Sequence, residues 1–311
     1  MQRVCVVGAG VIGSLYAAHL AQVAEVSVLT RREEHARALG EQGLRVSGKS
    51  DFVAGIAATS NVERLPDFEL AILATKATEL DEAAARLEGR FPRATLMTVQ
   101  NGLGAEEIVR RLGAWPIVSA VTFMSGTRHG DAHVEYVLDT ETWLGPYEET
   151  PLETVQEIAG LLVRAGLKAR TLADVRPAQW SKLIFNATVN GVAALTRLPH
   201  DDHFADRDEP WQLGHLIHGL VDEGKQIAGA AGVPLQDDPW EMNVLATRRG
   251  SAHYPSMLED VEARRPTELE LINGSLVREA RRAGVKAPLH EALYALVHAR
   301  QSAYLPVAVE A

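Results

Sequence analysis

The chain has 311 residues, of which 46% are hydrophobic and 23% are charged, as in an ordinary globular protein. At roughly 150 residues per domain, this length predicts two domains or one large one. The net charge of −10 argues against nucleic-acid and anionic-membrane partners, and the single cysteine, Cys5, excludes an internal disulfide framework. No apolar run reaches the roughly 18 residues of a membrane-spanning helix. We therefore expect a cytoplasmic protein without a nucleic-acid or membrane partner.

Short apolar runs alternate with helical patterns in the first half of the chain, which predicts a parallel sheet covered by helices. Two later runs, at residues 133–137 and 142–144, are typical of an antiparallel edge. From about residue 152 onward the apolar periodicity is almost wholly helical. The predicted parallel strands are residues 3–7, 25–30, 70–75, 95–99 and 117–121, and the helices between them are 12–21, 32–42, 79–87 and 105–112.

These elements predict an α/β fold with an N-terminal Rossmann-type doubly wound sheet and a C-terminal all-helical domain. A charged turn around residues 173–177 is the expected boundary. The first domain then covers residues 1–173, and the second covers residues 174–311. A homodimer through the helical domain is compatible with the sequence, although no pattern identifies an interface.

A glycine-rich loop follows the first predicted strand and precedes the first predicted helix. Residues 8–13 match the pattern G-x-G-x-x-G, in which glycines permit a tight turn, close approach to a pyrophosphate and close helix–strand packing. The helix N-terminus adds oriented N–H groups for the phosphates. A glycine-rich turn that binds nothing is the alternative, but the strand–loop–helix frame favours a dinucleotide. The predicted cofactor contacts of this loop are Gly8, Gly10, Val11, Ile12 and Gly13.

The end of the second predicted strand indicates which dinucleotide binds. An NAD site usually places Asp or Glu there to accept from the ribose 2′-OH, whereas this chain has Arg31 and Arg32. A guanidinium suits a 2′-phosphate because its planar donors can bind two oxygens at once. The alternative is a solvated pair that Glu33 and Glu34 neutralise. The sequence favours NADPH over NADH, with Arg31 as the main phosphate contact.

One apolar helix carries a polar stripe. Residues 180–195 are apolar nearly all round, which predicts a buried helix. Lys182, Asn186 and Asn190 recur at every fourth position and span an arc of about 80°. These side chains either form a narrow solvent-exposed stripe, with the lysine reaching water, or they line a polar cleft. The spacing alone leaves both interpretations open.

Other polar residues have an ordinary structural explanation beside a functional one. Ser256 begins an S-x-x-E capping box, and Thr267-Glu268 after a proline also fits a helix cap. Asn101 precedes a glycine, as in many turns. Asn101 and Lys76 also follow predicted parallel strands, and ligands of open α/β sheets bind at such strand ends.

Metal and hydrolase chemistry have little support. Two H-x-x-H pairs occur, at residues 200–203 and 215–218, but no clear third ligand accompanies them. The chain also lacks a G-x-S-x-G elbow, so nothing supports a serine hydrolase. We expect no metal site.

Taken together, these motifs resemble the ketopantoate reductase (2-dehydropantoate 2-reductase) family over essentially the full chain. The lysine–asparagine helix and the two later blocks are fairly specific, whereas many dehydrogenases share the glycine loop. The resemblance implies NADPH-dependent reduction of the 2-oxo acid ketopantoate to pantoate, in pantothenate and coenzyme A synthesis. The matching segments are residues 8–13, Arg31, 75–77, 100–102, Lys182 with Asn186 and Asn190, 255–260 and 267–274.

The resemblance also implies a role for each site residue. Lys182 would be the general acid, and Glu268 would bind and orient the reacting oxygen. Hydride addition builds negative charge on the ketone oxygen, which a nearby ammonium stabilises and protonates. Burial lowers the pKa of such a lysine, while a neighbouring carboxylate opposes that change. Asn186, Asn190 and Ser256 would contact the substrate, while Lys76 and Asn101 would line the junction of cofactor and substrate and contact both.

Two positions depart from the family pattern. Glu79 stands where the family often has Gln, and His253 stands where it often has Asn. These differences leave open a different branched or hydroxylated 2-oxo acid as the substrate. A non-catalytic NADPH-binding regulator is a third interpretation. It is disfavoured because a mere sensor would not need the lysine, asparagines, serine and glutamate of the site.

Overall fold

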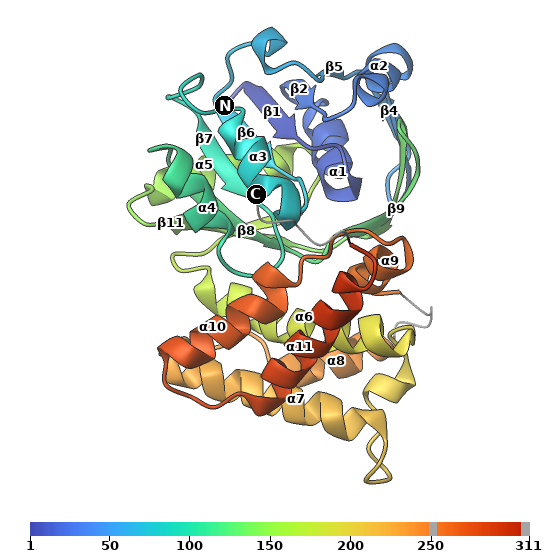
Figure 1. Cartoon of the computed structure of the whole chain (residues 1–311). Coiled ribbons are helices and arrows are strands. Elements are labelled where there is room, and N and C mark those ends of the chain that lie inside the picture. The colour runs from blue at the N-terminus through green and yellow to red at the C-terminus, as the bar shows by residue number, and fades with distance from the viewer. Residues whose placement is uncertain (249–253, 306–311) are drawn as a thin grey trace, which may run out of the picture. The chain divides into compact units, whose positions relative to one another are not determined.

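The computed structural model describes residues 1–248 and 254–305 (Figure 1). The chain divides into two units. The first consists of Met1–Gln100 and Ala105–Val175, and the second consists of Asn101–Gly104 and the chain from Arg176 onward. A four-residue segment inside the N-terminal half thus belongs to the C-terminal unit. His253, one of the two positions that depart from the family pattern, lies outside the described residues.

The main sheet of the first unit has eight strands in the order β12-β11-β8-β7-β6-β1-β2-β5. The six strands from β5 to β8 are parallel, and their order along the sheet is that of a Rossmann fold. The predicted doubly wound sheet is therefore confirmed. The strands are β1 (Arg3–Val7), β2 (Glu25–Leu29), β5 (Ala57–Thr59), β6 (Leu70–Leu73), β7 (Thr95–Thr98), β8 (Ile117–Thr122), β11 (Thr142–Tyr147) and β12 (Ala169–Thr171).

A second sheet corrects the predicted antiparallel edge. Residues 142–144 do join the main sheet, since β11 pairs antiparallel with β8. Residues 133–137, however, belong to β10, which pairs with β3 and β9 in a separate sheet of order β4-β3-β10-β9. The physical reason is that the inward side chains of β10, Val134 and Tyr136, pack in the core around α1. This sheet contains β3 (Leu44–Gly48), β4 (Phe52–Ala54), β9 (Ser125–Gly130) and β10 (His133–Leu138).

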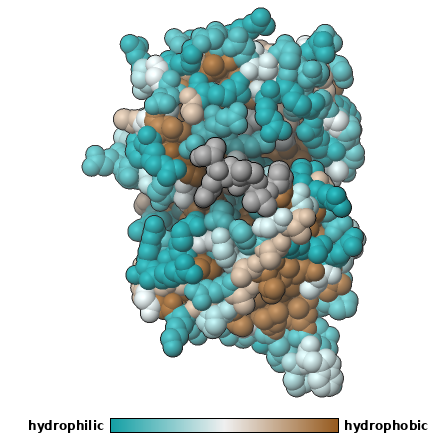
Figure 2. Space-filling view, in the orientation of Figure 1, coloured by the Kyte–Doolittle hydropathy of each residue, from teal (hydrophilic) through white to brown (hydrophobic). Residues whose placement is uncertain are grey.

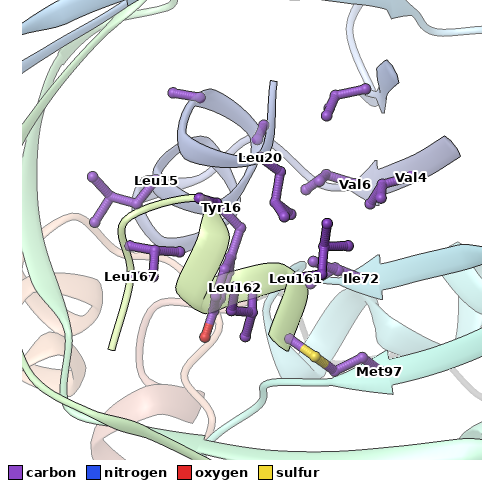
Figure 3. Packing of buried hydrophobic residues seen from close by; sticks show 14 of the residues in the cluster. Val4, Val6, Leu15, Tyr16, Leu20, Ile72, Met97, Leu161, Leu162 and Leu167 are labelled. Atoms are coloured by element: carbon purple, nitrogen blue, oxygen red, sulfur yellow. The ribbon is translucent and has the colours of Figure 1, made fainter. Parts of the chain in front are cut away.

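Helix α1 (Val11–Leu20) lies between these sheets, with contacts to β1 and β2 and to β3, β9 and β10. Its residues from Gly13 to Leu20 are all buried, because strands cover more than one side of the helix. Figure 3 shows Leu15, Tyr16 and Leu20 of α1 among the side chains of the strands and of α5. The helix that follows the glycine loop is therefore held in the core from Gly13 onward.

The remaining helices of the first unit lie close to their predicted ranges. The predicted helix at 79–87 is split, because a 3₁₀ turn, η2, leads into a shorter helix, α3. The segment from residue 152 is less purely helical than expected, since β12 follows α5. These elements are α2 (Glu33–Gln42), η1 (Val62–Arg64), η2 (Ala77–Glu79), α3 (Leu80–Ala85), α4 (Ala105–Leu112) and α5 (Leu152–Arg164).

The second unit is built around α6 (Arg176–Thr196), which contacts α7, α8, α9, α10, α11 and η4. Most of its residues from Ala178 to Ala194 are buried, as its nearly uniform apolar sequence predicts. The predicted all-helical domain is thus confirmed. Around α6 lie η3 (Asp202–Phe204), α7 (Leu213–Ala230), α8 (Pro239–Thr247), α9 (Ser256–Glu262), the π-helical turn η4 (Glu270–Gly274), α10 (Ser275–Arg282) and α11 (Pro288–Ser302).

The surface of the second unit has an apolar area. Leu216 of α7 and Leu289 and Leu296 of α11 are exposed, and Figure 2 shows hydrophobic surface on this unit. Of the helices that the structure describes, none has the length and apolarity needed to cross a membrane.

Candidate active site

The glycine loop has the geometry that a dinucleotide requires. Gly8 has a φ of +94°, and a Cβ there would lie 2.8 Å from the Cγ2 of Thr75. A Cβ on Gly13 would collide with the carbonyl oxygen of Gly8. Gly10, in contrast, is exposed, and a Cβ there would meet nothing within 4 Å. Two glycines thus close the turn, and the middle one leaves open space beside the backbone, which fits the approach of a pyrophosphate.

The start of α1 completes this cradle. Gly10 is the N-cap and provides no side-chain hydrogen bond, so Val11 and Ile12 begin the helix with N–H groups that no cap satisfies. Such groups and the helix dipole attract phosphate. The loop also follows β1 at the place where β1 borders β6. The strand order reverses between these two strands, and ligands of such sheets bind there. The five predicted loop residues therefore fit a pyrophosphate.

Both arginines after β2 are in ion pairs. Arg31 pairs with Glu79, and Arg32 pairs with Asp131 at 2.7 Å. Neither of these partners is one of the two glutamates that follow the arginines in the sequence. Glu79 thus lies beside the predicted 2′-phosphate contact, because η2 follows β6 and Arg31 follows β2 at the same edge of the sheet.

Lys76 and Asn101 lie in different units. Lys76 is exposed directly before η2, in the first unit. Asn101 begins the short segment that belongs to the second unit. Its neighbour Gly102 has a φ of +96°, and a Cβ there would collide with the carbonyl oxygen of Leu271 in η4. The Leu103 N–H donates a 2.9 Å hydrogen bond to that same oxygen. This segment is therefore docked closely on the π-helical turn.

A chain of side-chain contacts joins three predicted residues in the second unit. The Nδ2 of Asn101 donates a hydrogen bond of 3.1 Å to the Oε2 of Glu268. The Nδ2 of Asn186 in α6 lies 3.5 Å from the Oδ1 of Asn101, at the long end of hydrogen-bond distances. The structure therefore brings together an amide from the short segment, an amide from α6 and the predicted carboxylate.

Lys182 interacts electrostatically with the same carboxylate. Burial lowers the pKa of Lys182 to about 8, and the negative charge of Glu268 opposes that change. Asn186 and Asn190 are 8% and 6% exposed, so their face of α6 is not a solvent-exposed stripe. A buried amine with a pKa of about 8, under the electrostatic influence of a carboxylate, has the properties of a general acid.

The two expected helix caps have different outcomes. Ser256 is the first residue of α9, and Pro255, not Ser256, occupies the N-cap position. The interpretation of Ser256 as a capping residue is therefore wrong, and its side chain is exposed on a helix that packs against α6. Thr267 does accept a local bond, since its Oγ1 receives the Leu269 N–H at 3.3 Å. That bond spans the position of Glu268.

Sequence reasoning missed the residues that hold the Glu268 turn. The Oε1 of Gln301 accepts the Thr267 N–H at 2.8 Å and the Thr267 hydroxyl at 2.7 Å. The buried carboxylate of Asp260 accepts from Arg265 Nε at 3.0 Å. Asp260 lies in segment 255–260, which matches the family pattern, so the sequence could have indicated it. Gln301 offered none, because 34 positions separate it from Thr267.

The histidine pairs have structural partners. The Nε2 of buried His200 lies 2.8 Å from the Oδ1 of Asn243, and the Nδ1 of His203 lies 2.8 Å from Asp201. Across residues 1–248 and 254–305, no three His, Cys, Asp or Glu side chains are grouped so that they could hold a metal ion.

Comparison with known proteins shows similarity along both units. A family model for ketopantoate reductase PanE/ApbA matches residues 4–149, and a model for the C-terminal part of the same family matches residues 174–301. The 2-dehydropantoate 2-reductase of Pyrococcus horikoshii is 30% identical over 301 residues, which are 96% of this chain and 98% of that protein.

Solved structures have the same fold. The 2-dehydropantoate 2-reductase of Methylococcus capsulatus is 27% identical with a TM-score of 0.84, over 97% of this chain and 98% of that one. A D-mandelate dehydrogenase, solved with NADH and anilino(oxo)acetate, is 22% identical with a TM-score of 0.88, over 97% and 99% of the two chains.

The family models and the Pyrococcus relative together cover nearly the whole chain, including the glycine loop and the lysine–asparagine helix. Membership of this family implies a nicotinamide cofactor, in agreement with the Rossmann strand order and the cradle at the start of α1. The chain belongs to the ketopantoate reductase PanE/ApbA family and is an oxidoreductase.

Proposed function

We propose that this protein reduces a 2-oxo acid with NADPH, and that the substrate is 2-dehydropantoate, which becomes pantoate. The observation that carries the proposal is the pair formed by Lys182, whose pKa is lowered to about 8, and Glu268. The names of the full-length relatives support the substrate. Pantoate formation would place the reaction in the synthesis of pantothenate and coenzyme A.

The chemistry assigns the proton to Lys182. When bound, a nicotinamide would supply the hydride that adds to the carbonyl carbon of the substrate. As that bond forms, the electron pair of the C=O bond moves to oxygen, and the ammonium of Lys182 gives this oxygen a proton. The product is a 2-hydroxy acid, and the neutral amine regains its proton from water. With a pKa of about 8, Lys182 is mostly protonated at neutral pH and gives up its proton readily.

The amides and the carboxylate position the reacting oxygen. Glu268 keeps Lys182 charged, since its negative charge raises the pKa that burial lowers. Asn101 and Asn186 hold that carboxylate through their hydrogen-bond chain. We assign contacts to the substrate to Asn190, which shares the polar face of α6, and to Ser256, which begins α9.

The first unit would hold the cofactor. Gly8, Gly10 and Gly13 with the first turn of α1 would bind the pyrophosphate, and Arg31 would bind the 2′-phosphate. Lys76 follows β6 beside this loop, where it would contact both ligands. The expected domains, residues 1–173 and 174–311, would thus separate cofactor binding from acid–base chemistry. Asn101, although it lies before residue 173, would take part in the acid–base chemistry.

The direct test is a substrate panel with the purified protein. Mixing it with NADPH and 2-dehydropantoate should consume the absorbance of the reduced nicotinamide. Other branched or hydroxylated 2-oxo acids should give a lower kcat/KM, and a better one would replace 2-dehydropantoate as the substrate. Binding of NADPH without turnover of any oxo acid would make the protein a regulator instead.

A Lys182→Ala variant tests the mechanism in the same assay. Its kcat should fall about 10²- to 10⁴-fold, the usual contribution of one acid–base group. The Kd for NADPH should stay unchanged, because Lys182 lies in the second unit. An unchanged kcat would remove Lys182 from the mechanism.

A further inference from the structure

The ion pair between Arg31 and Glu79 joins the predicted 2′-phosphate contact to an acidic residue. We propose that Glu79 determines the dinucleotide preference of this protein, because it competes with the 2′-phosphate of NADPH for Arg31. This inference rests on the proposed cofactor site and goes beyond it. Without Glu79 the same site would favour NADPH more strongly over NADH.

The sheet order explains why residues 48 positions apart in the sequence meet. β2 and β6 are the two neighbours of β1, and all three strands are parallel. Their carboxyl ends therefore share one edge, where Arg31 follows β2 and Glu79 lies in the turn after β6. The pair thus stands at the edge that carries the glycine loop, where the nucleotide is expected.

The pair is open to solvent, with side chains that are 70% and 41% exposed for Arg31 and Glu79. Exposed ion pairs contribute little to stability, so a bound dianion can displace the carboxylate from the guanidinium. A phosphate monoester carries a charge near −2 at neutral pH. At Arg31 it would both break the pair and lie within a few ångströms of a carboxylate of the same sign. Both effects weaken the binding of NADPH.

NADH avoids both costs. Its ribose carries a 2′-OH, which can donate a hydrogen bond to a carboxylate, as it does to the acidic residue of NAD sites. Glu79 therefore acts selectively against the phosphorylated dinucleotide.

Arg32 does not provide an equivalent second contact. It pairs with Asp131 at 2.7 Å, and Asp131 also pairs with Arg128. Asp131 lies between β9 and β10, in the second sheet of the unit. Arg32 is therefore held toward that sheet, and the competition concerns Arg31.

The test is the affinity of the whole protein for NADPH and NADH, measured without substrate by the fluorescence of the reduced nicotinamide. In Glu79→Gln the Kd for NADPH should fall about 3- to 30-fold at low salt, where charge interactions are least screened. The Kd for NADH should change less than about twofold, because the amide oxygen still accepts the ribose hydroxyl.

Glu82→Gln is the matched control, since it removes the same charge from an exposed position on α3. It should leave both Kd values unchanged. An equal gain in NADPH affinity in this control would mean that net charge, and not the contact with Arg31, is responsible. That result would overturn the inference, as would an unchanged NADPH affinity in Glu79→Gln.

Arg31→Ala separates this inference from the proposed function. A rise in the Kd for NADPH and not for NADH supports the phosphate role of Arg31. If that rise occurs and Glu79→Gln has no effect, only the competition is refuted. If Arg31→Ala changes both Kd values equally, the proposed NADPH site is itself wrong. Failure of both the wild-type protein and Glu79→Gln to bind NADPH would overturn both.

Discussion

Asn101 donates a hydrogen bond to Glu268 across a sequence separation of 167 residues. The asparagine closely follows β7, a strand of the first unit, yet it belongs to the helical unit. Its side chain links Asn186 of α6 to the carboxylate that interacts with Lys182. The orientation of Glu268 therefore depends on the short segment that contains Asn101.

The pH dependence of reduction should follow Lys182. Its pKa is about 8, so the kcat/KM for oxo acid reduction should be constant below that pH and fall above it. Burial lowers this pKa and Glu268 raises it. In Glu268→Gln the negative charge that raises the pKa of Lys182 is lost, so the alkaline limb of the pH profile should move to lower pH. Steady-state rates across the pH range measure this shift.

The control for that profile is Glu270→Gln. Glu270 is exposed and interacts with Tyr294 and Arg278 instead of Lys182. This variant should leave the alkaline limb in place. A limb that stays fixed in Glu268→Gln, or one that moves equally in both variants, would contradict the electrostatic role of Glu268.

Gly102→Ala should displace the segment that carries Asn101. The new Cβ would meet the Leu271 carbonyl oxygen at a positive φ, which we expect to cost about 2 kcal/mol or more of stability. Because Asn101 would move away from Glu268, kcat/KM should fall at least about tenfold. Urea unfolding and steady-state kinetics report the two effects.

Gly40→Ala provides the comparison, since a Cβ there meets nothing within 4 Å and Gly40 lies within helix α2. It should be neutral or slightly stabilising. If Gly102→Ala kept full activity, the docked segment would have no part in positioning Glu268.

Gln301 should act as a positioning residue, through the buried Thr267 beside Glu268. Gln301→Met removes the acceptor of two donors, and we expect roughly tenfold lower kcat/KM together with an alkaline limb at lower pH. Gln301→Glu retains acceptor oxygens and should restore both properties. A loss of stability in the Met variant with an unchanged pH profile would reduce Gln301 to a purely structural role.

Glu223 should stabilise the start of α11. Its carboxylate is 7% exposed and accepts the Leu289 N–H at 3.1 Å and the His290 N–H at 2.8 Å. Glu223→Ala leaves both donors unpaired and should cost about 2 kcal/mol in urea unfolding. Glu223→Gln keeps one acceptor and should cost less. Equal losses in both variants would show that the N–H bonds are not the source of the stability.

The sequence was sufficient where neighbours along the chain determine the structure. The buried parallel strand Leu70–Leu73 is a continuous apolar run, and the glycine loop needs its residue types for its own turn. Ser125–Gly130 was missed because it is polar and largely exposed, with a strand conformation that comes from pairing with β10. The short strand Ala57–Thr59 likewise has no clear pattern of its own.

The same distinction applies to the candidate site. The spacing of Lys182, Asn186 and Asn190 along one helix was visible in the sequence, because a helical face repeats about every four residues. The contacts of Glu79 and of Gln301 were not, since each partner comes from a distant part of the chain. Tertiary pairing of this kind leaves no periodic signal.

The second unit consists of two separate segments of the chain, which restricts how gene fragments of such proteins can be exchanged. Residues Asn101–Gly104 belong to the second unit, but they lie far upstream of its main part, which begins at Arg176. A gene fragment that starts at Arg176 encodes Lys182, Asn186 and Glu268 without Asn101. Exchange of that fragment between two related proteins would therefore unite a carboxylate from one parent with an amide from the other, and the two parents would have to be compatible at the Asn101–Glu268 hydrogen bond and at the contact of Gly102 and Leu103 with Leu271.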